Sequence, residues 1–205
     1  MPEPVEERSL TVVSPSTWEP LSTDDAKTNL REDGSAQDGR IDELIQTARE
    51  VVEEATGRAL TRKRYRLTLD AFPPESEIPL PRPPLVADST ATPITVQYVK
   101  QDGTTATFAS SRYFVDTDAE PGRIVLEHSE NWPAEVLRPA AAVQVTYSAG
   151  YEDESSVPER AKQYMHLLVG HWYENREAVA VGTVTKEIEL AVKSLRAALL
   201  VPEVP

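Results

Sequence analysis

The stretch from Ser156 to Ala178, SVPERAKQYMHLLVGHWYENREA, predicts a long, buried helix. Ser156 and Glu159 have the spacing of a capping box, and Pro158 falls in the first turn, where a missing N–H does no harm. Apolar residues then recur at helical spacing and form one face for burial: Val157, Ala161, Met165, Leu168 and Trp172. We therefore expect a structural helix, with Trp172 and Tyr173 near its packed end.

Two histidines on this helix raise the question of a metal or catalytic site. His166 and His171 are five residues apart, on divergent faces, whereas ligation from one helix requires a spacing of three or four. His171 and Glu174 have an allowed spacing but no third ligand. Phosphate-binding loops, a GxSxG elbow and an HExxH motif are all absent from the sequence. We expect no enzyme, no metal and no cofactor; the alternative is a hydrolase that uses His166 or His171.

Composition favours a globular protein that works outside the membrane. The 205 residues are 27% charged and 40% hydrophobic, enough for one good domain or a small domain with extensions. The longest apolar run, Ala197–Val201, is too short to span a bilayer, and the N-terminus lacks a signal pattern. We expect a product made in the cytoplasm. The chain has no cysteine, which excludes disulfides and thiolate metal sites.

The net charge of −13 is unevenly distributed. Residues 1–57 hold 14 acidic and 5 basic residues, or −9, while residues 58–151 carry −1 and residues 152–205 carry −3. An acidic chain does not gain affinity for DNA by releasing counterions. We therefore expect DNA to be repelled from this protein and not held by it.

The order of the expected elements is helices, strands, then helices. We expect residues 1–20 to form an extended, Pro-rich arm that contains Trp18, and deletion of this arm should leave the fold intact but weaken assembly. Residues 21–57 form the N-terminal helices. Ser22 and Asp25 make a capping box for a helix that ends near Arg31, and an apolar stripe from Ile41 to Ala55 ends at Gly57, the expected C′ residue.

Residues 58–151 change to a period of two, which predicts a β-rich insertion. The first strand lies in RKRYRLTLD, and later strand candidates are Ile94–Lys100, Thr105–Phe108, Tyr113–Asp116, Arg123–Glu127 and Ala142–Tyr147. Asp102-Gly103 favours a tight hairpin, and the six prolines within Phe72–Pro84 exclude a central strand there. The sheet should be antiparallel, because no helical crossover separates its strands.

The C-terminal third completes an expected α+β fold. Residues 152–177 form the long bundle helix, and residues 178–205 form a flexible loop and a last helix that stops at Pro202. The fold is thus a helical bundle of N- and C-terminal helices with an inserted antiparallel β-rich portion.

Arginines alternate along the first strand and form a candidate docking face. Arg62, Arg64 and Arg66 fall on one side, opposite Tyr65 and Leu67. The face is either a solvated exterior or a contact for an acidic neighbour, such as the N-terminal region of another copy. Nucleic acid is the third alternative, and it is less favoured because the only flanking aromatic, Tyr65, points the other way. Trp18 docks either on its own domain or on a neighbouring chain.

Several ordered motifs carry a resemblance to a known family. They are Thr56-Gly57-Arg58, Pro121-Gly122-Arg123-Ile124, Ala149-Gly150-Tyr151 and the run from His171 to Arg176, with fitting spacing from about Leu21 to Val181. The sequence resembles the tailed-bacteriophage head–tail connector (adaptor) family, that is, the gp6-like connectors and their prophage and gene-transfer-agent relatives. The arm before Leu21 departs from the usual start of that family.

The resemblance implies a structural protein of the virion neck. Copies would form a twelvefold ring under the portal protein, extend the DNA channel, and join the portal to a head-completion (stopper) or tail protein. DNA would pass without specific binding. The portal would be contacted through the C-terminal segment, with five candidate residues: Val184, Ile188, Val192, Leu195 and Leu199. The alternative from another class is a soluble α+β ligand-binding module of a virion or cell surface.

Overall fold

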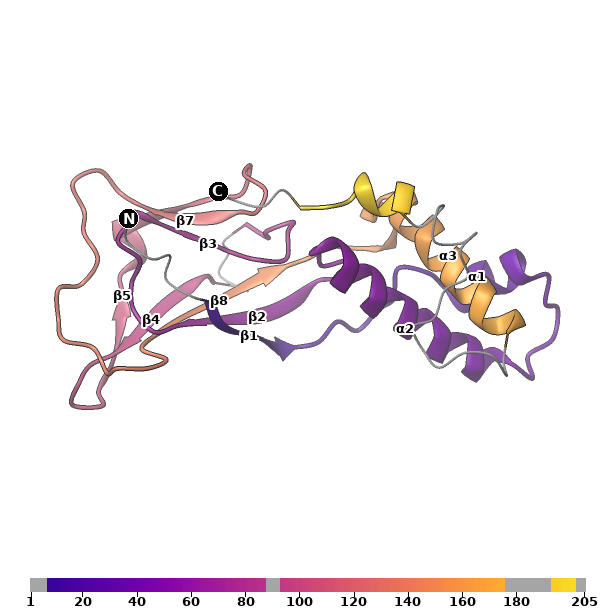
Figure 1. The fold of residues 1–205 in the computed structure, drawn as a ribbon, viewed down its shortest axis with the longest axis horizontal. Coiled ribbons are helices and arrows are strands. Elements are labelled where there is room, and N and C mark those ends of the chain that lie inside the picture. The colour runs from indigo at the N-terminus through magenta and orange to yellow at the C-terminus, as the bar shows by residue number, and fades with distance from the viewer. Residues whose placement is uncertain (1–6, 88–92, 176–192, 202–205) are drawn as a thin grey trace. The chain divides into compact units, whose positions relative to one another are not determined.

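The computed structural model describes residues 7–87, 93–175 and 193–201, and it has an α+β fold (Figure 1). The chain divides into two compact units. The β-rich unit is built on residues 62–150 together with the strand that precedes Pro15, and the helical unit is built on residues 16–61 and 151–201. None of the described helices is both long enough and apolar enough to cross a bilayer.

A five-stranded antiparallel sheet forms the larger layer of the β-rich unit. Its strands, in spatial order, are β1 (Glu7–Ser14), β2 (Lys63–Leu69), β8 (Val143–Ala149), β4 (Thr95–Val99) and β5 (Thr105–Phe108). The predicted alternation on β2 is confirmed, because Tyr65, Leu67 and Leu69 are buried, with 2–5% exposed, while Arg66 is exposed. The β4–β5 hairpin turns at Gly103, whose φ of 87° suits the left-handed turn position.

A three-stranded sheet lies over this layer, as Figure 1 shows for its β3 and β7 strands. Its order is β3 (Glu77–Pro79), β7 (Arg123–Leu126) and β6 (Tyr113–Asp116), with a short 3₁₀ turn, η1 (Ser110–Arg112), leading into β6. The proline-rich segment thus supplies only an edge strand, as expected from the missing N–H of proline.

Aromatic rings fill the core of the β-rich unit. Tyr65 of β2 stacks on Tyr147 of β8 with ring centroids 5.8 Å apart, and Phe108 stacks on Tyr113 at 5.9 Å. The Tyr113 hydroxyl donates to the carbonyl oxygen of Ile94 at 3.0 Å, so its polar end is satisfied inside the core. The two contacts of Tyr113 join the smaller sheet to the larger one.

The first strand corrects the expectation for the N-terminal arm. Residues 7–14 pair with β2 over the register from Glu7↔Leu69 to Ser14↔Arg64 and form an edge of the larger sheet. A run of six residues, Ser9–Ser14, without charge or proline supports this pairing, although its period-two pattern is too weak to read from sequence alone. Deletion of the arm would therefore remove an edge strand of the larger sheet.

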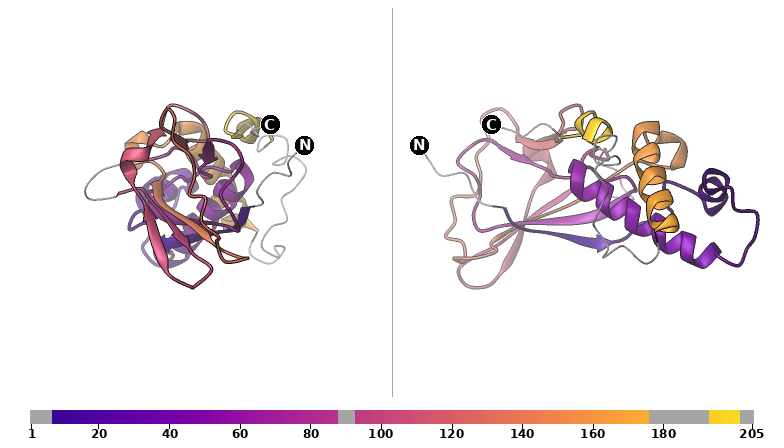
Figure 2. Two further views of the ribbon diagram at one scale, coloured as in Figure 1. Left: turned by 90° about the vertical axis from the view of Figure 1, so that its left-hand side faces the viewer. Right: turned by 45° about the vertical axis from the view of Figure 1, so that its right-hand side comes forward.

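The labelled α-helices of the helical unit are α1 (Thr23–Leu30), α2 (Asp38–Thr56) and α3 (Glu159–Glu174), and residues 193–197 are helical as well. α2 packs against α3, and α1 contacts both of them (Figure 2). The Ser22–Asp25 capping box is confirmed, as is Gly57, which ends α2 at a φ of 73° while its N–H donates to the carbonyl oxygen of Glu53.

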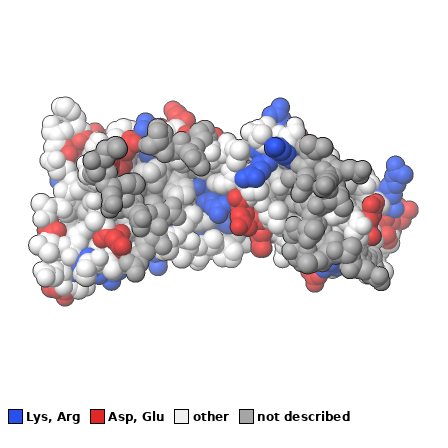
Figure 3. Space-filling view, viewed as in Figure 1, with Lys and Arg blue, Asp and Glu red and all other residues white. Residues whose placement is uncertain are grey.

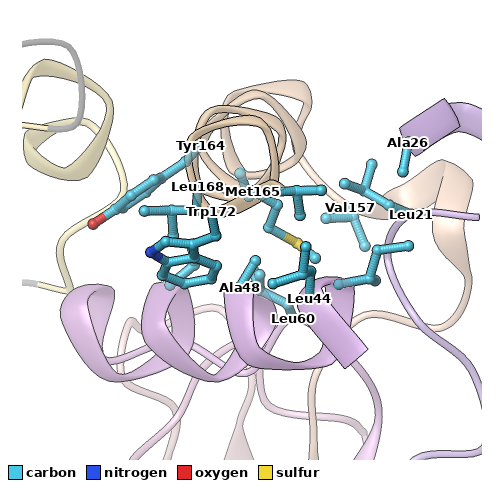
Figure 4. Close-up of a cluster of buried hydrophobic side chains, with 14 of the residues drawn as sticks. Leu21, Ala26, Leu44, Ala48, Leu60, Val157, Tyr164, Met165, Leu168 and Trp172 are labelled. Atoms are coloured by element: carbon cyan, nitrogen blue, oxygen red, sulfur yellow. The ribbon is translucent and has the colours of Figure 1, made fainter. Parts of the chain in front are cut away.

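The buried side chains between these helices are those of the predicted stripes. Ile41, Leu44, Ile45, Ala48 and Val52 of α2 face Ala161, Met165, Leu168 and Trp172 of α3, all of them 0–4% exposed (Figure 4). Apolar burial of this kind is worth roughly 1.5–3 kcal/mol for each large side chain. The periodicity of the Ser156–Ala178 stretch therefore identified the core correctly.

The predicted capping box of that helix is wrong. Ser156 closes a different box with Asp153 around the short 3₁₀ turn η2 (Glu154–Ser156), in which the Ser156 N–H donates to Asp153 Oδ1 at 2.9 Å. α3 begins at Glu159, directly after its N-cap residue Pro158, and no side chain caps its first turn. Val157, between η2 and Pro158, is extended, because a residue before proline avoids the helical region.

Gly122 carries a testable packing constraint in the β-rich unit. A Cβ at this position would lie 2.6 Å from Leu85 Cβ and 3.2 Å from the Asp116 carbonyl oxygen. Gly122→Ala is therefore expected to lower the free energy of unfolding by about 1–3 kcal/mol, since the Leu85 stem cannot move away freely. Chemical denaturation measures this change. Gly39→Ala, where a Cβ meets nothing within 4 Å, is the matched control, and equal stability of the two variants would contradict the constraint.

Candidate assembly surfaces

The outer face of the five-stranded sheet presents the predicted arginines. Arg64 and Arg66 both lie on this face of β2, while Arg62 lies one residue before the strand. Arg66 is flanked by Thr11 on β1 and by Thr146 on β8. Arg64 is flanked by Ser14 and Ser148, and its Nη2 donates to the Pro93 carbonyl oxygen at 2.9 Å.

The register neighbours of Arg64 and Arg66 are therefore all uncharged. Their positive charge meets no carboxylate across the strand pairs of β2, in the part of the sheet that the structure describes. A guanidinium in such surroundings is well suited to a carboxylate that comes from outside the unit.

The solvent face of α2 is acidic. Asp42, Glu43, Glu50 and Glu54 are exposed along it, and Arg40, which pairs with Glu43 at 3.2 Å, lies at its start. This places much of the excess negative charge of residues 1–57 on one helix. On the face drawn in Figure 3, acidic and basic side chains are interspersed, and neither sign covers a broad area of the described surface. Such a surface does not favour non-specific DNA binding.

Not all of the charge on α2 is exposed. Arg49 donates to Glu19 at 2.7 Å and to Glu53 at 3.1 Å, and Glu53 also accepts the Leu60 N–H at 2.8 Å. Burial alone would lower the pKa of Arg49, but the hydrogen bond to Glu19 and the neighbouring carboxylates raise it above its usual value. Arg49 and Glu53 therefore connect α2 to the segment before it, at Glu19, and to the segment after it, at Leu60. The sequence reasoning missed this network, because no short-range pattern links Glu19 to Arg49.

Trp18 lies on its own helical unit. It is half-buried and packs against the helical core, and its carbonyl oxygen accepts from the Ser16 hydroxyl at 3.0 Å. In the isolated chain Trp18 therefore packs on its own unit, and its contact with a neighbouring chain stays a prediction.

The candidate portal-contact residues separate into two groups. Val184, Ile188 and Val192 lie outside the described residues. Leu195 and Leu199 are described, and both pack against the helical core, with Leu199 only 5% exposed. In contrast, Leu200 is 47% exposed. Leu199 is thus buried in the isolated chain, and its contact with the portal stays a prediction.

The outer edge of β1 is a second feature that the sequence reasoning missed. Val12 and Val13 are 52% and 45% exposed on a strand that pairs, among the described strands, with β2 alone. Natural proteins usually protect such an edge with charges or prolines, and Ser9–Ser14 contains neither. The uncharged run in the sequence was the available signal.

The histidines of α3 occupy structural and pocket-lining positions. His171 is 7% exposed, and the Asn175 side-chain nitrogen lies 3.2 Å from its Nδ1 and donates to its carbonyl oxygen at 2.8 Å. His166 lines a pocket of about 400 Å³ together with Asp25, Glu154 and Lys162. Within the described ranges, no group of three or more histidine and carboxylate side chains is arranged to hold a metal ion.

The pocket gives His166 a pH-dependent effect on stability. Burial lowers the pKa of His166, and the opposing effect of the Asp25 and Glu159 carboxylates is smaller, while Lys162 lowers it further. The unfolded chain therefore binds the proton at this position more readily than the folded protein does. The contribution of His166 to the free energy of unfolding is fully present above pH 6.5 and is lost as the pH falls below that value. His166→Gln should reduce this loss, as measured by urea midpoints at pH 7.5 and 5.5. The exposed His128→Gln is the control, and an unchanged slope in His166→Gln would contradict the prediction.

Comparisons with known proteins identify the fold. No family model and no curated protein matches the sequence. Among solved structures, the chain is similar to one in the neck of an empty gene transfer agent particle computed with C6 symmetry, at 20% identity and a TM-score of 0.74. It is also similar to chains of a native gene transfer agent virion and of the native particle neck computed with C12 symmetry, both at 19% identity, with TM-scores of 0.73 and 0.71. Each match covers 96% of this chain and 97% of the other.

Proposed function

We propose that this protein is a structural head–tail adaptor of a tailed phage or phage-like particle. It forms a twelvefold ring under the portal protein, extends the DNA channel, and joins the head to the next stopper or tail component. It is located in the virion neck after synthesis in the cytoplasm of the bacterial host. The observation that carries this proposal is the fold likeness to neck chains, which extends over almost the whole length of both proteins.

The charge of the chain is compatible with a conduit for DNA. A net charge of −13 and the interspersed signs of Figure 3 provide no strong electrostatic attraction to the phosphate backbone. DNA can thus move along such a ring without being held.

The separated charges are compatible with a ring of identical subunits. A ring requires a heterologous contact, in which two different patches of the same protein meet. The exposed carboxylates of α2 form one such patch, and Arg64 and Arg66 on the outer face of β2 form the other. The uncharged edge of β1 is available beside the arginines for additional contact.

The C-terminal segment, residues 178–205, is the proposed portal contact. Leu200 is the exposed apolar residue of its described part, and Leu195 and Leu199 anchor that part to the helical unit. Val184, Ile188 and Val192 stay candidates on the basis of the sequence.

Reconstitution with the portal tests the function. The purified chain is mixed with the portal protein of the same genome, and mass photometry and negative-stain electron microscopy follow the product. The expected result is a ring of twelve copies on one end of the portal. Persistent monomers in the presence of the portal would overturn the proposal, and saturable binding of a small molecule or glycan by the monomer would favour a ligand-binding module.

A further inference from the structure

The last described residues of the chain close the C-terminal end of α2. Residues 193–197 are helical, and residues 196–201, which we name the C-terminal strap, run back to the turn at Thr56-Gly57-Arg58. Leu199 inserts into the helical core with 5% of its surface exposed, while its neighbour Leu200 is 47% exposed. The strap therefore has one buried face and one open face.

Polar contacts between the strap and α2 are reciprocal. Arg196 Nε donates to the Ala55 carbonyl oxygen at 2.8 Å, and the Val201 N–H donates to the Thr56 carbonyl oxygen at 3.2 Å. In return, Arg58 Nε donates to the Leu199 carbonyl oxygen at 2.6 Å. The last carbonyl groups of a helix lack partners within it and favour a positive charge nearby. The strap supplies both the missing donors and the charge.

Gly57 completes the fit between the two segments. A Cβ at this residue would lie 3.6 Å from Val201 Cγ2 and 3.8 Å from Val201 Cβ, which is ordinary contact. The end of α2 and Arg58 thus form a surface shaped for a short peptide with an arginine, a buried leucine and an extended end.

We infer that residues 55–58 form a receptor for the C-terminal strap, and that the strap leaves this receptor when the C-terminal segment engages its partner. The second half rests on the proposed function, in which that partner is the portal. The strap is held by one fully buried side chain and three hydrogen bonds, so it can open locally while the α2–α3 core stays folded. The C-terminal segment would then have two conformations, one with the strap bound to residues 55–58 and one with the strap released and bound to the portal.

A cysteine pair tests the receptor in the full chain. The Cβ separation of 3.8 Å at positions 57 and 201 matches that of a disulfide, and the protein has no other cysteine. Gly57→Cys/Val201→Cys is therefore expected to form an intramolecular disulfide in the monomer under mild oxidation. A variant that stays reduced, or that forms disulfides only between chains, would overturn the receptor. The two single-cysteine variants are the controls, because Gly57→Cys alone measures the strain of a side chain at the left-handed φ of position 57.

Amide hydrogen exchange provides a second test that adds no cross-link. Arg58→Ala removes the bond to the Leu199 carbonyl oxygen and is expected to speed exchange of the Leu199 and Val201 amides at least fivefold. The amides in the middle of α3 should keep their rates, and so should the strap amides in the exposed control Arg40→Ala. Unchanged strap exchange in Arg58→Ala would contradict the assignment.

Binding to purified portal rings tests the release. The oxidised cysteine pair is expected to bind at least tenfold more weakly than the same protein after reduction, with the reduced protein close to wild type. Equal binding in the two redox states would overturn release of the strap. If the wild type and both redox states of the cysteine variant fail to bind the portal, the proposed function is overturned. Disulfide formation and amide exchange in the isolated chain still test whether residues 55–58 bind the strap.

Discussion

Trp172→Ala is expected to lower the free energy of unfolding by about 3–5 kcal/mol, which is a large part of the stability of a domain of this size. Trp172 is 4% exposed and lies in the α2–α3 core, where its removal leaves a cavity that the surrounding helices fill only in part (Figure 4). Urea or guanidinium denaturation followed by circular dichroism measures the change.

Trp172→Phe distinguishes the contribution of the buried aromatic ring from that of the indole N–H group. The indole Nε1 is buried without a hydrogen-bond partner among the described residues, and an unsatisfied buried donor costs about 1–3 kcal/mol. Phenylalanine loses some apolar area but removes this cost, so it should destabilise by less than about 1.5 kcal/mol. Leu200→Ala, at an exposed position, is the surface control. If Trp172→Ala were no more destabilising than Leu200→Ala, the core described for the helical unit would be incorrect.

Arg64→Glu/Arg66→Glu is expected to abolish ring assembly while leaving a folded monomer. Both side chains lie on the outer face of β2 beside uncharged neighbours, so reversal adds no buried charge but replaces attraction to a carboxylate by repulsion. Mass photometry of the variant with the portal should show subunits in place of rings. Circular dichroism should match that of the wild type.

A matched control separates position from net charge. Arg40→Glu/Arg160→Glu changes the net charge by the same amount, with both residues exposed on the helical unit. It should assemble as wild type does, and increasing salt should weaken wild-type assembly because exposed charges are screened. Normal rings from Arg64→Glu/Arg66→Glu would show that the arginine face is only a solvated exterior.

The sequence predicted best where one local pattern decided the structure. The apolar stripes of α2 and α3, the Ser22 capping box, Gly57 at the end of α2, and β5 and β6 at their observed bounds all follow from spacing within a short window. The chain also shares its fold with a chain of a gene transfer agent neck, and gene transfer agents are among the relatives that the ordered motifs indicated.

Prediction failed where a distant partner decided the outcome. Residues 7–14 are a strand because β2 lies beside them, and Ser156 pairs with the η2 N-cap residue Asp153 because Pro158 separates it from α3. Leu199 has the periodicity of an amphipathic helix, which does not tell whether its apolar face meets another protein or its own core. The contacts of Arg58 and Arg196 span 141 residues, and no pattern within the sequence marks them.

We propose that copies of this chain form the ring between the portal and the next neck component. Electron cryomicroscopy of intact particles, or of portal–neck complexes purified from them, can locate the chain in the density. We expect twelve copies in one ring directly below the portal, with the C-terminal segment of each copy on the portal side and the DNA channel at the centre. Density that places the chain elsewhere in the particle, or a neck that lacks it, would overturn the proposed function.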